Sequence, residues 1–295
     1  MQGGQRPMAE TLIEDIGFAA ADGWPLAGTL YHSQAEATHA VMMSAGTGFP
    51  RRFYRHFAQY LAGRGAMVLT YDYRGIGGSF NAGHGFANIE YSDWGRYDMP
   101  AAVDVLARVA GDLPLAHVAH SVGGHFLGLM PNQSRLLRHA FLSIGTGYWG
   151  GHHWRNIPKE FYFWWGLGSY SLWRHKAVMP IGGWQGEALP PRLFRTWRRW
   201  SHRRGYFQPD LEGALQPQAY AEVNAPIRSW IFSDDPIATR ASGRDLLAVY
   251  PSADTELVVR SPREYGVNRI GHEGAFRPGR EALWDEVSDW LECGL

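Results

Sequence analysis

Short apolar runs, rich in β-branched and aromatic residues, alternate along this chain with amphipathic stretches. Such alternation predicts a mainly parallel β-sheet with helices on both faces. The first two runs are separated by Ala21, Asp22 and Gly23, a turn sequence that predicts an antiparallel pair. The runs that predict strands are residues 11–18, 24–31, 39–46, 67–73, 115–120, 139–145, 227–234 and 256–260. We therefore expect an α/β fold with a mostly parallel sheet of about eight strands.

Helical spacing marks residues 52–63, residues 93–110 and a terminal stretch from Arg280. Two of these helices carry an apolar stripe that is expected to face the sheet. The stripes are formed by Met99, Ala102, Val103, Leu106 and Val109, and by Leu283, Trp284, Val287, Trp290 and Leu291.

Residues 148–218 differ in composition from the rest of the chain. They hold eight of the 13 tryptophans, and their ten Lys and Arg against four Asp and Glu leave a formal charge of +6. A compositional island between two strands predicts a lid inserted over the ends of the sheet. We therefore expect an α/β core made of residues 1–147 and 219–295, with residues 148–218 as the lid.

Composition narrows the class of protein further. Hydrophobic residues at 45% and charged residues at 19% are typical of a folded globular chain, and 28 basic against 28 acidic residues argue against nucleic acid as a partner. The single cysteine, Cys293, excludes an internal disulfide and a thiolate metal cage. The run from Phe161 to Trp173 is too short to span a membrane. Because the N-terminal residues MQGGQRPMAETL lack the apolar stretch of a signal peptide, we expect a cytoplasmic protein.

The strongest chemical signal is a serine between an apolar strand and a helical pattern, in the sequence Leu-Ala-His-Val-Ala-His-Ser-Val-Gly-Gly-His over residues 115–125. A turn this tight requires small residues two positions before and after Ser121, and Ala119 and Gly123 meet that need. The pattern predicts a nucleophile elbow that exposes the Ser121 hydroxyl. A helix beginning at Val122 would direct free N–H groups at the charge that develops on a substrate oxygen.

These residues resemble the α/β-hydrolase superfamily, whose usual motif is Gly-x-Ser-x-Gly, with Ala119 in place of the first glycine. The segment from Tyr71 to Ser79 is similar to the Asp-x-Arg-Gly-x-Gly-x-Ser turn of that superfamily, where it is usually structural. Within the superfamily, the chain most resembles the serine-aminopeptidase and monoacylglycerol-lipase branch. The resemblance covers nearly the whole chain outside residues 148–218.

The resemblance implies a triad in the chain order serine, acid, histidine. The segment Ser233-Asp234-Asp235-Pro236 is similar to the loop that supplies the acid, and Asp235 is the preferred residue, with Asp234 as the alternative. His272, in a glycine-flanked loop before the last helix, is the implied general base. The backbone N–H groups of Val122 and Thr47 are the implied oxyanion donors.

Other polar residues near these motifs receive less specific roles. We assign Gly46, His120, Tyr148 and Trp149 to the substrate pocket. Strand and helix geometry is nevertheless expected to turn the rings of His120 and His125 away from the catalytic position. The adjacent histidines at 152 and 153 lack nearby carboxylate or cysteine partners and are a poor metal site. We expect neither a metal nor a cofactor.

The lid contains a basic stretch with two interpretations. Leu193, Phe194, Trp197 and Trp200 share a helical face, crowded by Arg192, Arg195, Arg198, Arg199, Arg203 and Arg204. This face either packs the lid onto the core, which we favour, or contacts an anionic membrane surface.

The motifs together predict a serine hydrolase that cleaves an ester of an apolar acyl or aromatic small molecule through an acyl-enzyme. A thioesterase, an amidase and an acyltransferase would use the same residues. A non-catalytic receptor or carrier that keeps the pocket is the alternative from another class.

Overall fold

The computed structural model describes residues 12–33, 35–81 and 85–294, so residue 11 of the first predicted strand and nearly all of the N-terminal segment lie outside the described residues. Eight strands form one sheet in the order β1-β2-β4-β3-β5-β6-β7-β8, in which β2 runs antiparallel to both of its neighbours, β1 and β4, and all other neighbouring strands are parallel. The strands are β1 (Leu12–Ala19), β2 (Pro25–His32), β3 (His39–Ser44), β4 (Ala66–Tyr71), β5 (Leu115–His120), β6 (Leu136–Leu142), β7 (Ile227–Phe232) and β8 (Thr255–Arg260). The predicted α/β fold class and its eight-stranded sheet are confirmed.

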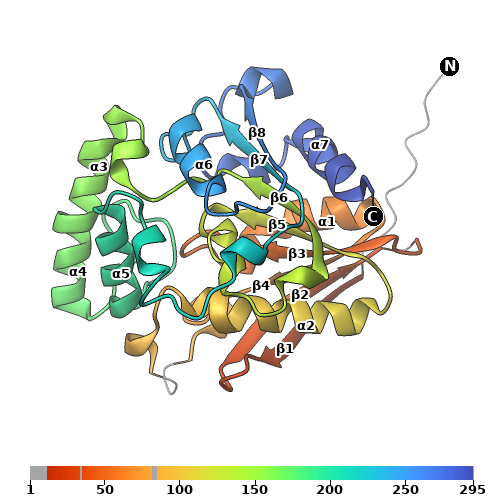
Figure 1. Cartoon of the computed structure of the whole chain (residues 1–295), viewed down its shortest axis with the longest axis horizontal. Coiled ribbons are helices and arrows are strands. Elements are labelled where there is room, and N and C mark those ends of the chain that lie inside the picture. The colour runs from red at the N-terminus through yellow and green to blue at the C-terminus, as the bar shows by residue number, and fades with distance from the viewer. Residues whose placement is uncertain (1–11, 34, 82–84, 295) are drawn as a thin grey trace.

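Helices flank this sheet (Figure 1). The α-helices are α1 (Arg55–Gly63), α2 (Met99–Ala110), α3 (Ile157–Phe161), α4 (Gly168–His175), α5 (Pro191–Ser201), α6 (Arg240–Leu247) and α7 (Glu281–Glu292). Helices α1 and α7 pack against each other, α2 contacts β3 and β4, and α6 contacts β7 and β8. None of the helices in the described residues is long and apolar enough to cross a lipid bilayer.

The central strands are buried on both faces, which explains why they read as nearly continuous apolar runs. Every residue of β3 and β5 is buried. Parallel strands covered by helices on both sides have no solvent face and therefore lose the alternation of polar and apolar residues. The parallel pairing of β3 with β5 sets their carboxyl ends side by side in the middle of the sheet, at Ser44 and Ala119.

The prediction that a helix begins at Val122 is wrong. Ser121–Gly124 and Leu127–Leu129 form only short 3-10 turns. Glycine is a poor helix former, and the two glycines after Gly123 sit where a side chain has no room. A Cβ on Gly124 would lie 2.4 Å from Ile144 Cδ1, and one on Gly128 would lie 2.2 Å from the Tyr220 ring. Close packing against Ile144 and Tyr220 therefore takes the place of a regular helix.

Residues 148–218 lie between β6 and β7 and contain α3, α4 and α5. In Figure 1, α3 and α4 form the outer edge of the molecule, with α5 between them and the sheet. Leu193, Phe194 and Trp200 of α5 are buried, as the packing interpretation predicts. The segment is joined to the core by the Glu187 N–H, which donates to the Gly48 carbonyl at 2.8 Å. The insertion thus reaches the loop that follows β3.

The turn from Tyr71 to Ser79 is built around a buried carboxylate. Asp72 accepts the Arg51 N–H at 2.5 Å and the Gly78 N–H at 2.9 Å. Gly77 has φ +49°, and a Cβ there would lie 2.6 Å from Asp72 Oδ2. Only glycine fits this position, because the carboxylate fills the space of a side chain.

Candidate active site

Ser121 occupies a sharp turn directly after the central strand β5. Its φ of +50° is unusual for a residue other than glycine, and such strain is typical of a nucleophile elbow. A Cβ on Gly123 would lie 2.5 Å from the Ser44 carbonyl oxygen, so the turn presses against the end of β3. The requirement for a small residue two positions after Ser121 follows from this contact.

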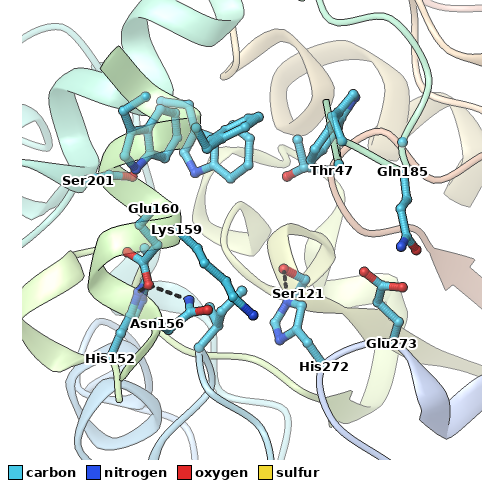
Figure 2. A pocket seen from close by; sticks show the side chains of 18 of the residues that line it. Thr47, Ser121, His152, Asn156, Lys159, Glu160, Gln185, Ser201, His272 and Glu273 are labelled. Atoms are coloured by element: carbon cyan, nitrogen blue, oxygen red, sulfur yellow. Dashed lines mark hydrogen bonds and ion pairs between the residues drawn. The ribbon is translucent and has the colours of Figure 1, made fainter. Parts of the chain in front are cut away.

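The structure brings Ser121, His272 and Asp235 into one hydrogen-bonded chain. His272 Nε2 lies 3.1 Å from Ser121 Oγ, and His272 Nδ1 lies 2.9 Å from Asp235 Oδ2. Figure 2 shows the imidazole directed at the serine hydroxyl. With Nδ1–H donating to the carboxylate, Nε2 carries the lone pair that can accept the serine proton.

The electrostatic surroundings favour a protonated His272 beside an ionised Asp235, which is the charge separation that proton transfer from Ser121 to His272 requires. Burial by itself lowers the pKa of His272, but the Asp235 carboxylate outweighs it, so that pKa is raised above its ordinary 6.5. Burial raises the pKa of Asp235, but the His272 ring and the N–H groups of Ile237 and Ala238 hold it below 3.8. Asp235 is therefore an anion that stabilises an imidazolium.

Asp234 and Asp235 have different partners, although they are neighbours in the chain. Asp234 Oδ2 accepts the Ile270 N–H at 2.9 Å, and its Oδ1 accepts the Gly271 N–H at 3.0 Å. It thereby holds the loop that carries His272. The structure thus places Asp235 at the imidazole and Asp234 behind the loop.

His120 joins the two loops on either side of Ser121, which the sequence did not reveal. Its Nε2 lies 2.9 Å from the His272 carbonyl oxygen, and its Nδ1 lies 2.8 Å from the Tyr54 hydroxyl. That hydroxyl accepts the Gly46 N–H at 2.7 Å. Because the carbonyl can only accept, Nε2 carries the proton and the Tyr54 hydroxyl donates to Nδ1. Burial lowers the pKa of His120 to about 3, which keeps the ring neutral.

The two predicted oxyanion donors lie at the expected turns. Val122 is the second residue of the 3-10 turn that starts at Ser121, where N–H groups have no partner within the turn. Among the described residues, the Thr47 N–H has no hydrogen-bond acceptor, while the Thr47 hydroxyl contacts the Tyr91 hydroxyl. Trp184 of the insertion closes over this loop, since a Cβ on Gly48 would lie 2.6 Å from its ring.

A cavity of about 470 Å³ opens at Ser121 and His272. Its walls come largely from residues 148–218 and are rich in aromatic rings, with Lys159, Gln185 and Glu273 among the polar groups (Figure 2). The aromatic lining consists of Phe49, Tyr91, Tyr162, Phe163, Trp164, Trp184, Trp197 and Tyr206. The abundance of tryptophan in this segment was the sequence signal for this wall, but it did not identify the individual residues.

Four residues that we assigned to the pocket do not line this cavity: Gly46, His120, Tyr148 and Trp149. Gly46 faces the His120 ring, which lies within 2.7 Å of where a Cβ would stand, and that ring is fully buried. Tyr148 folds over Gly150, and Trp149 packs against Phe161.

The expectation for His125 was wrong in the opposite way. We expected its ring to turn away from the catalytic position, and the structure places it in the cavity wall. Its Nε2 lies 3.0 Å from the Gly145 carbonyl oxygen. The expected direction assumed a regular helix after Ser121. His125 instead follows the 3-10 turn Ser121–Gly124, and its ring lines the cavity.

The described sheet, with a serine at a strained turn after its fifth strand, defines an α/β-hydrolase fold. Three solved structures with this fold are similar over nearly the whole chain. A soluble variant of monoglyceride lipase from Saccharomyces cerevisiae has a TM-score of 0.68 at 14% identity, covering 98% of this chain and 96% of that one. The esterase Pf2001 from Pyrococcus furiosus has a TM-score of 0.61 at 14% identity, covering 96% and 92%. A dienelactone hydrolase from Anabaena variabilis has a TM-score of 0.56 at 14% identity, covering 96% and 97%.

A family model described as serine aminopeptidase, S33, matches residues 35–170, which include Thr47 and Ser121. Comparison with curated protein sequences finds no match. The chain thus has the α/β-hydrolase fold, and its residues 35–170 are similar to the serine aminopeptidase family.

Proposed function

We propose that this protein is a serine hydrolase that cleaves carboxylic esters through an acyl-enzyme. The observation that carries the proposal is the unbroken contact from Asp235 through His272 to Ser121 at the mouth of a cavity. A serine hydroxyl is a weak nucleophile, and an adjacent imidazole oriented by a carboxylate is the usual means of activating it.

In the first half-reaction, Ser121 Oγ bonds to the substrate carbonyl carbon while its proton moves to His272 Nε2. The N–H groups of Val122 and Thr47 hold the negative oxygen that forms. When the intermediate collapses, the bond to the leaving oxygen breaks and His272 returns the proton to it. Water then attacks the acyl-enzyme by the same route, which releases the acid and restores the Ser121 hydroxyl.

The cavity supports an apolar acyl or aromatic substrate. Its volume of about 470 Å³ is in the range of small-molecule sites, and its aromatic wall offers large contact area to apolar groups. The names of the similar structures, an esterase and a monoglyceride lipase, agree with ester chemistry. We further propose that residues 148–218 act as a lid, because their side chains form most of the wall above Ser121.

Labelling with a fluorophosphonate, followed by hydrolysis of p-nitrophenyl esters of increasing chain length, tests the proposal. The wild type is expected to be labelled on Ser121 and to turn over the esters, while Ser121→Ala does neither. Ser252→Ala, on an exposed turn, is the matched control and should behave as the wild type. An unlabelled, inactive wild type would refute the hydrolase and favour a receptor or carrier.

A further inference from the structure

The insertion presents an exposed row of aromatic rings on its outer edge. Residues 154–176, here called the outer rod, run without a break from the 3-10 turn Trp154–Asn156 through α3, the π-helical stretch Tyr162–Leu167 and α4. In Figure 1, α3 and α4 lie on the opposite side of the molecule from α7. The exposed rings are Trp154 (67%), Tyr162 (57%), Trp165 (55%), Tyr170 (54%) and Trp173 (71%).

Buried residues alternate with these rings at helical spacing. Of the five rings, Tyr162 also borders the cavity, and the Trp165 N–H donates to His202 Nε2 at 3.0 Å. Trp164, Leu167 and Ser171 point inward and are buried, and Trp164 packs against Phe194 of α5. An exposed Trp or Tyr alone needs no explanation, but several on one helical face form a patch that normally has a partner. Tryptophan and tyrosine are the residues enriched where a protein meets the lipid–water interface.

The charge of the outer rod points to the same partner. Arg155, Arg174 and Lys176 are exposed beside the rings. The only acidic residue of the rod, Glu160, is turned inward, where it accepts hydrogen bonds from His152 and Asn156 at 2.8 and 2.6 Å. The outer face is therefore cationic and aromatic, which complements anionic lipid headgroups. Two copies of this face would repel each other.

Two exposed arginines of α5 are already paired with carboxylates. Arg192 is paired with Glu90 at 2.7 Å, and Arg199 is paired with Asp210 at 2.8 Å. The aromatic residues between them are mostly buried. The surface suited to lipid is thus the outer rod and not the basic helix that the sequence singled out.

We propose that the outer rod docks the protein on the surface of a membrane containing anionic lipid. The rings would lie at the headgroup level, and the basic side chains would contact phosphates. Because Asn156, Lys159 and Phe163 of the same rod line the cavity, docking would bring the cavity close to the lipid. The proposal stands whether or not the protein is a hydrolase.

Sedimentation with vesicles tests it, using Ser121→Ala protein so that no lipid is consumed. Binding is expected to vesicles of phosphatidylcholine with about 30% phosphatidylserine, to be much weaker with phosphatidylcholine alone, and to fall as salt rises. Trp154→Ser/Trp173→Ser should weaken binding at least about tenfold. Arg155→Gln/Arg174→Gln should weaken it about 25-fold, at about fivefold for each charge.

Phe80→Ser/Leu137→Ser is the matched control, because both residues are about half exposed and lie outside the outer rod. It should bind as well as the parent protein. Circular dichroism melts establish that each variant is folded, and the charge pair tests the surface without removing an apolar ring. No vesicle binding at about 20 mM salt would overturn the proposal. So would binding unaffected by both rod variants, or a dimer in analytical ultracentrifugation that Trp154→Ser/Trp173→Ser abolishes.

Discussion

Four buried histidines whose pKa values lie far below 6.5 make the stability of this protein sensitive to mild acid. His117, His120, His125 and His139 are each at most 4% exposed. Burial lowers the pKa of His120, His125 and His139 to about 3, and it lowers the pKa of His117 well below 6.5. His117 and His139 also face each other, with their Nδ1 atoms 3.1 Å apart, so protonation of either is opposed by the other ring.

The direction of this pH effect follows from the number of protons that the folded and the unfolded states bind. A histidine in the unfolded chain has a pKa of about 6.5 and binds a proton at pH 5, whereas these buried rings bind almost none. The unfolded state therefore takes up more protons, and stability is present above about pH 6.5 and lost as the pH falls below it. At about pH 5, each ring lowers the free energy of unfolding by about 2 kcal/mol relative to its value at neutral pH. The three rings with pKa values near 3 together lower it by about 6 kcal/mol.

A loss of about 6 kcal/mol is comparable to the whole free energy of unfolding of a typical domain. His272 acts in the opposite direction, because its pKa is raised and its stabilisation is present at low pH and lost as the pH rises. One ring cannot offset four. We therefore expect the protein to be close to unfolding near pH 5, which is above the ordinary pKa values of Asp and Glu carboxylates.

Urea unfolding followed by tryptophan fluorescence at several pH values measures this effect. The free energy of unfolding should fall by at least about 4 kcal/mol between about pH 7.5 and about pH 5. His139→Asn removes one of the four rings and should reduce that fall by about 2 kcal/mol, whereas His175→Gln, at an exposed position, should leave it unchanged. A pH-independent free energy of unfolding, or equal slopes in His139→Asn and wild type, would refute the reasoning.

Three further outcomes follow from the geometry of the site. Asp235→Asn should lower kcat for a p-nitrophenyl ester by about 10⁴-fold, and Asp234→Asn by less than about tenfold; the reverse order would reassign the acid. Because the pKa of His272 is raised, kcat/KM should increase with pH through a midpoint above 6.5, and a flat profile would contradict its role as base. Gly123→Ala should lower the free energy of unfolding by about 1–3 kcal/mol, because the new Cβ meets the end of β3. Gly63→Ala, where a Cβ would have nothing within 4 Å, should not lower it. Equal urea midpoints for the two variants would refute this contact.

The sheet could be predicted from the sequence because its signal is local. Strands buried on both faces must be apolar throughout, and glycine-rich turns separate them. The helix after Ser121 was predicted wrongly because the glycines that follow accommodate Ile144 and Tyr220, which are distant in the chain. Local spacing cannot report such a contact. The lining of the cavity was missed for the same reason, since packing of the insertion onto the core decides which rings face inward.

The choice between Asp234 and Asp235 shows where sequence reasoning ends and what the fold adds. Adjacent carboxylates in one loop have the same local signal, and only their orientation separates them. The structure uses both: Asp235 meets the imidazole, and Asp234 fixes the backbone that carries it. His120 ties that same backbone to the loop of Gly46 through Tyr54. The position of His272 relative to Ser121 and the loop of Gly46 thus depends on neutral and anionic groups that do not line the cavity. These groups set the geometry on which the proposed chemistry depends.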